Sequence, residues 1–269
     1  MTARTQPATR RPAVAGLFYP GDRDALARNV SDLLASASTP DAPVPKAIIA
    51  PHAGYIYSGP IAANAYARLR PARSTITRVV LLGPTHRVAV RGLALPAAAR
   101  FATPLGAVDL DQEGIALLRG LPQVVVSDDA HALEHSLEVH VPFLQTVLED
   151  FKLVPLAVGH ADPEDVAEVL DALWGGPETL IVVSSDLSHY LTYGEAQAID
   201  RATCDAVLEL RSDIDHEHAC GATPVSGLAV AARRRHLKPE LIDVRNSGDT
   251  AGDKSRVVGY ASFAFYEDL

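Results

Sequence analysis

The feature that most constrains the fold is a set of three short apolar runs, each followed at once by a loop that carries a histidine. The runs cover residues 46–50, 78–82 and 179–183, and the histidines are His52, His86 and His189. Short β-branched runs bounded by Gly and Pro are typical of buried strands in a mostly parallel sheet. In open α/β sheets the loops at the carboxyl ends of the strands form the ligand site. The sequence therefore predicts one convergent site, and a metal site fits three histidines best.

Helical and strand patterns alternate along the chain, which favours one α/β domain over residues 1–269. Helices are expected at 22–35, near 61–69 after Ser58-Gly59-Pro60, and at 112–118, 163–174, 195–210 and 224–232. Further strands are expected at 88–95, 153–158, 241–244 and 257–265. The predicted fold is a three-layer α/β/α domain with a mostly parallel central sheet. Residues 1–11 are expected to form a flexible lead-in.

Composition narrows the classes of function. The formal net charge is -9, and an acidic chain repels phosphate backbones, so nucleic acid is not an expected partner. The only cysteines are Cys204 and Cys220, too few for a disulfide framework and suited to a reducing cytosol. No run of about 18 apolar residues occurs, and the N-terminal segment lacks the apolar stretch of a secretory signal. We therefore expect a cytoplasmic protein with no membrane association.

Other residues near the predicted site have two interpretations each. Cys220 precedes a glycine at a predicted helix entry, where a thiol can be a ligand or nucleophile; alternatively it is a small buried hydrophobe. Asp186 precedes His189 by three residues and could orient its imidazole, or it could cap the next helix. Neither alternative excludes the other for Asp186.

Residues 131–135 read HALEH, which matches the H-x-x-E-H pattern of inverted zinc peptidases. That chemistry requires a helix that places His131 and His135 on one face. The match is short, so we expect His131 and Glu134 to be dispensable for metal binding. We expect His135, Glu138 and His140 to line the pocket or to brace the metal ligands.

Seven motifs occur in order along nearly the whole chain. They are PAVAGLFYP at 12–20, APHAGYIYSG at 50–59, GPTH at 83–86, TPLG at 103–106, EHSLEVHVP at 134–142, SSDLSHY at 184–190 and CG at 220–221. Together they resemble the MEMO family, called AmmeMemoRadiSam system protein B in bacteria and archaea. The resemblance implies a fold like that of class III extradiol dioxygenases, which hold non-haem Fe(II) with two His and a carboxylate.

The resemblance also implies roles for individual residues. The metal ligands would be His52, His86 and Cys220. Asp186 and His189 match further pocket residues of the family, and Phe18 and Tyr57 match aromatic positions at its rim. We assign catalysis to Asp186, His189 and His140, and substrate binding to Phe18, Tyr57, His135 and Glu138. Phe18 stands where the family usually has Trp. The change from a carboxylate to Cys220 argues against ring-cleaving dioxygenase activity.

The leading functional hypothesis is a metal-dependent redox enzyme that acts on an unidentified small molecule. Two imidazoles and one thiolate leave coordination positions open on iron, copper or zinc, and iron is the expected ion. One alternative is a metal- or peptide-binding interaction protein without turnover, and another is a zinc hydrolase that uses the H-x-x-E-H match. The family name points to functional links with a radical-SAM protein and an AMMECR-type protein.

Overall fold

The computed structural model describes residues 8–38 and 42–268, and within them a nine-stranded sheet forms the centre of the molecule. Four neighbouring parallel strands make its middle, in the order β2 (Ala47–Ala50), β9 (Thr179–Ser184), β3 (Arg78–Pro84) and β8 (Lys152–Val158). Their side chains are buried on both faces, which explains the continuous apolar runs in the sequence. The predicted strands that lead to His52 and His86 are thus confirmed as β2 and β3.

The flanks of the sheet are antiparallel, which the sequence did not indicate. On one side β12 (Val257–Tyr266) runs antiparallel to β2, to β11 (Lys238–Asn246) and to β10 (His189–Leu191). On the other side β4 (Leu93–Leu95) runs antiparallel to β8 and parallel to β7 (Val124–Val126). The parallel arrangement is therefore confined to the centre and to one edge pair.

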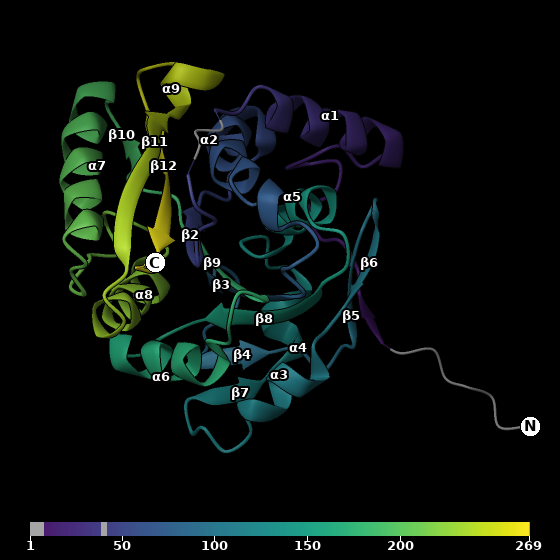
Figure 1. Cartoon of the computed structure of the whole chain (residues 1–269). Coiled ribbons are helices and arrows are strands. Elements are labelled where there is room, and N and C mark those ends of the chain that lie inside the picture. Colours follow the sequence, from purple (N-terminus) through teal and green to yellow (C-terminus); the bar gives the residue numbers. More distant parts are fainter. Residues whose placement is uncertain (1–7, 39–41, 269) are drawn as a thin grey trace, which may run out of the picture.

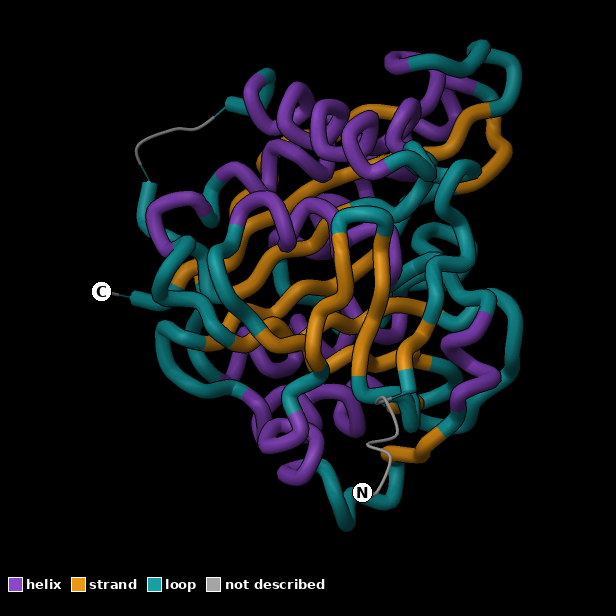
Figure 2. Tube along the Cα trace, turned by 90° about the vertical axis from the view of Figure 1, so that its right-hand side faces the viewer, coloured by secondary structure: helices purple, strands orange, loops and turns teal. Residues whose placement is uncertain are grey.

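Helices cover both faces of the sheet, which confirms the predicted α/β fold (Figure 1). Alternate residues of each strand face opposite layers. Ile48 belongs to the core on one face, which is covered by α1 (Arg23–Ala35), α2 (Tyr55–Ala67) and α5 (Val141–Val147). Ile49 belongs to the core on the other face, which is covered by α6 (Pro163–Leu173), α7 (Tyr193–Leu208) and α8 (Ala222–Arg234). Figure 2 shows the strands lying between these two groups of helices. The remaining helices are short: η1 (Arg70–Ala72), α3 (Gln112–Leu117), α4 (Asp128–Ala132), η2 (Glu138–His140) and α9 (Ser247–Thr250).

The predicted flexible lead-in at 1–11 is wrong for its described part. Residues 1–7 lie outside the described residues, but Thr9–Arg10 form β1, which pairs in parallel with β5 (Arg100–Thr103). β5 in turn pairs with β6 (Gly106–Asp109) in a small second sheet. Arg10 is buried and ion-paired with Glu138, so a buried charge pair joins this N-terminal segment to the middle of the chain.

Helix α2 begins at Tyr55, six residues before the predicted start, and contains Pro60. A proline inside a helix removes the bond to the carbonyl four residues earlier, here that of Ile56. Ile56 is 69% exposed, so water can satisfy that carbonyl. Gly59 faces α1 so closely that a Cβ there would lie 2.9 Å from Leu33. The Gly-Pro pair is thus a packing feature inside the helix and does not mark its start.

A search of the described residues for a helix long and apolar enough to cross a bilayer found no candidate.

Candidate metal centre

The strand register brings the three histidine-bearing loops to one edge of the sheet. β9 pairs with β2 on one side and with β3 on the other, and Ala50 lies opposite Ser184. His52 and His86 each follow the end of their strand by two residues. Cys220 arrives from the start of α8, where Gly221 packs so closely on Ser184 that a Cβ would lie 2.4 Å from its carbonyl oxygen. His52, His86 and Cys220, the three residues expected to bind metal, thus lie close together at this edge of the sheet.

The potential ligand atoms of these three residues all lie within 4.8 Å of one another. His52 Nε2 and Cys220 Sγ lie 3.3 Å apart. Metal–nitrogen and metal–sulfur bonds of roughly 2.0–2.3 Å in a tetrahedral site place two ligand atoms about 3.3–3.6 Å apart. Burial and the neighbouring histidines hold the pKa of His52 well below its ordinary value, so its ring is neutral and can offer a lone pair. The donor set therefore fits one soft or borderline ion.

Glu134 fixes the orientation of His86. Its carboxylate accepts a hydrogen bond from His86 Nδ1 at 2.8 Å, and it also accepts from the backbone amides of His86, His135 and Ser136. Burial alone would raise the pKa of Glu134, but these bonds outweigh it and the pKa is lowered to about 2. A carboxylate behind a metal-binding histidine selects its tautomer and leaves Nε2 free.

Glu134 therefore contacts a candidate ligand directly, a bracing role that the sequence analysis did not assign to it. A second group of three potential ligands, Glu134 with His86 and His135, also lies within 4.8 Å. Four hydrogen-bond donors already surround the Glu134 carboxylate, so we assign it to bracing His86 and not to holding an ion of its own.

His135 and Phe18 form one wall of the centre. The His135 ring stacks on His86 at a centroid distance of 4.6 Å and lies 5.4 Å from the His52 ring. Phe18 packs on the other side of His135 at 4.8 Å. Burial and the nearby His86 lower the pKa of His135 to about 4, so this ring is neutral at neutral pH. Tyr57 lies farther out, 38% exposed on the first turn of α2.

Asp186 and His189 do not pair as the sequence predicts. In the described part of the chain Asp186 faces His52: it accepts from the His52 amide at 2.7 Å, and its other oxygen lies 4.0 Å from His52 Nε2. Burial raises the pKa of Asp186 to about 7. His189 begins β10, half-buried, with its backbone opposite Val258. Asp186 therefore orders the His52 loop, while His189 lies on β10, which pairs with β12 and not with β2 or β9.

Glu138 and His140 support the centre from behind. The Glu138 carboxylate is buried and accepts from Arg10, Tyr19 and the amides of Ala13 and Val14, so it has no free position for a substrate. His140 is also buried, and both of its ring nitrogens are hydrogen-bonded within the protein. His140 reaches His52 through Ser184 and so fits the predicted bracing role, whereas Glu138 binds the N-terminal segment. The placement of both residues contradicts direct contact with a substrate.

The helix that a zinc peptidase would need at His131 and His135 is not formed. α4 ends at Ala132, and His131 turns away so that its Nε2 donates to the carbonyl of Ala94 at 2.8 Å. Its ring packs edge-on against Phe101. His131 is therefore a core residue, and the H-x-x-E-H pattern contributes Glu134 and His135 to the centre for other reasons.

Stability should fall on acidification because His131 is buried as a neutral ring. Burial lowers its pKa to about 4, so the unfolded chain binds a proton that the folded chain does not between about pH 6.5 and pH 4. Folding is favoured above this window and loses free energy as the pH falls through it. By linkage the loss is about 2 kcal/mol between roughly pH 7 and pH 5. Urea unfolding at both pH values should show a smaller loss in His131→Gln, and an equal loss would contradict this account.

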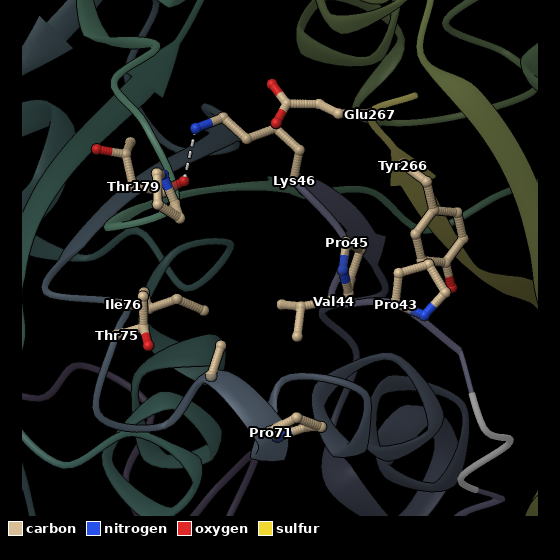
Figure 3. A pocket seen from close by; sticks show the side chains of 12 residues that line it. Pro43, Val44, Pro45, Lys46, Pro71, Thr75, Ile76, Thr179, Tyr266 and Glu267 are labelled. Atoms are coloured by element: carbon tan, nitrogen blue, oxygen red, sulfur yellow. Dashed lines mark hydrogen bonds between the residues drawn. The ribbon is translucent and has the colours of Figure 1, made fainter. Parts of the chain in front are cut away.

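A separate cavity of about 310 Å³ lies where the parallel strands begin, at the edge of the sheet opposite the histidines (Figure 3). Lys46 enters it from the start of β2, but its ammonium donates to the carbonyls of Trp174, Gly176 and Thr179 and so has no proton left to offer. Prolines and Val44 make up much of the remaining lining. This cavity contains none of the predicted site residues; the candidate ligands lie at the other edge of the sheet.

Comparison with known proteins places these observations in context. The family model described as "Memo-like protein" matches residues 10–264. A protein of Aquifex aeolicus named "MEMO1 family protein" is 37% identical over 268 residues, covering 95% of this chain and 98% of the relative. A protein of the same name from Archaeoglobus fulgidus is 34% identical, covering 95% and 99%. The crystal structure of the uncharacterized protein JW3007 from Escherichia coli K12 is similar in fold, with a TM-score of 0.50 at 13% identity, covering 80% of this chain and 98% of that one.

Proposed function

The chain belongs to the Memo-like protein family, and from the geometry of its centre we propose that it is a metal-dependent redox enzyme for a small molecule. The observation that carries the proposal is the approach of His52, His86 and Cys220 to within 4.8 Å at one edge of the sheet. Three protein ligands leave at least one coordination position for a substrate, as catalytic sites require.

The donor set favours iron, copper or zinc over magnesium or calcium because a thiolate is a soft ligand. We propose iron first, since a bound redox-active ion would supply one-electron chemistry to a substrate at the open position. Both cysteines are free thiols in the structure, Cys204 buried and Cys220 at the centre, which suits a reducing cytoplasm. We also propose functional links to a radical-SAM protein and an AMMECR-type protein, as the family name suggests.

Some of the surrounding residues would position the ligands, and another would transfer protons. Glu134 holds the His86 ring, and the Asp186 carboxylate orders the His52 backbone. Asp186 also reaches to within 4.0 Å of His52 Nε2, so it faces the space where a substrate would bind. His189, on β10, is the proposed proton donor or acceptor. Burial lowers its pKa, so its ring is neutral at neutral pH and would first accept a proton.

Metal analysis of protein purified without chelator tests this function, and His189→Ala makes the test specific. We expect about one iron per chain in the wild type and in His189→Ala, because His189 is not a ligand in this proposal. Any turnover by the wild type should fall by roughly 10²–10⁴-fold in the variant, the usual contribution of a general acid or base. Loss of metal from His189→Ala would instead make His189 a ligand and overturn the assignment of Cys220.

A second candidate is binding of a peptide or protein without turnover. Apolar side chains next to the centre in sequence are unusually exposed: Leu17, beside Phe18, is 80% exposed, and Tyr190, beside His189, is 65% exposed. Exposed apolar side chains around a site favour a macromolecular partner. Copper or zinc held at one equivalent, with no oxidation or reduction of any tested small molecule, would favour this candidate over the enzyme.

A further inference from the structure

Ser184, the last residue of β9, is the meeting point of two histidine rings and one carbonyl. Its hydroxyl oxygen lies 2.6 Å from His52 Nδ1, 2.8 Å from His140 Nε2 and 2.7 Å from the carbonyl oxygen of Ser136. All four residues are buried, so water does not compete for these contacts. Every contact around this oxygen is short enough to be a hydrogen bond.

The direction of each hydrogen bond at the Ser184 hydroxyl follows from the number of protons that the groups carry. A hydroxyl donates one hydrogen bond and accepts two. The Ser136 carbonyl can only accept, so the single hydroxyl proton of Ser184 is directed to it. Ser184 therefore accepts from both rings, and His52 and His140 must each carry their proton on the nitrogen that faces it.

The far side of His140 agrees with this assignment. Its Nδ1 lies 2.8 Å from the hydroxyl of Tyr66, which is fully buried. With its proton on Nε2, His140 has a free lone pair on Nδ1 that accepts from the phenol. Each group in the chain Tyr66, His140, Ser184 and Ser136 thus has its hydrogen bond satisfied in one orientation.

From this network we infer that Ser184 is a positioning residue that locks His52 in the Nδ1–H tautomer, so that the bare Nε2 faces Cys220 before any ion arrives. The inference rests on the proposed function in one respect, namely that His52 Nε2 is used to bind metal. The network is not a path for protons: Ser184 gives its proton to a carbonyl, and the chain of contacts ends at the buried Tyr66.

The two histidines of the proposed metal site are therefore oriented by different hydrogen-bond acceptors. His86 donates to a charged carboxylate, that of Glu134. His52 donates to a neutral hydroxyl in a buried setting, which selects a tautomer without favouring the charged ring. The same result, a free Nε2, is reached at both ligands.

The test compares Ser184→Ala with Ser58→Ala in metal-free, full-length protein. Ser58 is the matched control: it is equally buried and its hydroxyl donates to the carbonyl of Ala53, next to His52, but it touches neither ring. Long-range ¹H–¹⁵N spectra report the tautomer of each neutral histidine, with the His52 signals assigned from their absence in His52→Ala. We expect an unprotonated Nε2 in the wild type and in Ser58→Ala, and a mixture of tautomers in Ser184→Ala.

Zn²⁺ affinity provides the second readout. Loss of an outer hydrogen-bond partner of a ligand typically weakens metal binding by roughly 10–100-fold, so Ser184→Ala should lose that much and Ser58→Ala less than about threefold. A protonated Nε2 in the wild type, an unchanged tautomer in Ser184→Ala, or equal affinity losses in the two variants would overturn the inference. An unprotonated Nε2 in a wild type that binds no Zn²⁺ would support the tautomer lock and refute the proposed metal function.

Discussion

Glu138→Ala is expected to lower the free energy of unfolding by about 3–5 kcal/mol, the usual cost of removing one partner from a buried charge pair. Arg10 and Glu138 are both buried, so the variant leaves a guanidinium without its counter-charge. The hydroxyl of Tyr19 and the amides of Ala13 and Val14 lose their acceptor at the same time. Urea unfolding followed by circular dichroism measures the difference in free energy.

An exposed ion pair supplies the control for this prediction. Arg211 and Asp213 pair at 2.8 Å, and both side chains are more than half exposed. Solvent and salt screen such pairs, so Asp213→Ala should unfold with a free energy indistinguishable from that of the wild type. Equal, small effects of the two substitutions would show that Glu138 does not hold the N-terminal segment to the core.

The convergence of the candidate ligands could be predicted from the sequence because it depends on strand order along one edge. Each apolar run is buried on both faces, and parallel strands deliver their following loops to the same side. His52 and His86 needed only that rule. Cys220 does not follow a strand, and it was reached through the motif resemblance. The close packing of Gly221 on Ser184 explains how the structure brings it to the same edge.

The residues that brace the centre could not be predicted in the same way. Arg10 and Glu138 are 128 positions apart, and no periodic pattern links them. Glu134 stood in the short zinc-peptidase match and in the motif at 134–142, but neither indicated its partner, because His86 lies on a different loop. Ser184 is the last residue of an apolar strand, where a small polar side chain ordinarily indicates only the strand end.

The antiparallel strands at the flanks of the sheet could not be predicted from the sequence either. The direction of a strand relative to its neighbour depends on which strand it meets, and β12 reaches β2 from the far end of the chain. Its apolar run reads the same in either direction. The early start of α2 could not be predicted for a local reason. Gly59 and Pro60 normally indicate a helix boundary, but here Gly59 lies within the helix, closely packed against Leu33.

The double substitution His52→Ala and His86→Ala is expected to abolish stoichiometric metal binding while the fold persists. It removes both imidazoles from the group of three ligands that lie within 4.8 Å, and one thiolate alone does not hold an ion against water. Glu134→Gln should retain the metal but bind it roughly 10–100-fold more weakly, because His86 Nδ1 then lacks its charged acceptor. His131→Ala, which removes a ring bonded to Ala94, should bind as the wild type does.

The most direct measurement is a Co²⁺ titration of metal-free protein followed by absorbance, since thiolate-to-cobalt charge transfer reports a sulfur ligand. We expect the wild type to saturate at one equivalent of Co²⁺ and to show a thiolate band. The band should be present in Cys204→Ala and absent from Cys220→Ser and from the double histidine variant. Cys204 is fully buried in α7, away from the predicted ligands. Titration without saturation, or a thiolate band that persists in Cys220→Ser, would contradict a metal centre built from His52, His86 and Cys220.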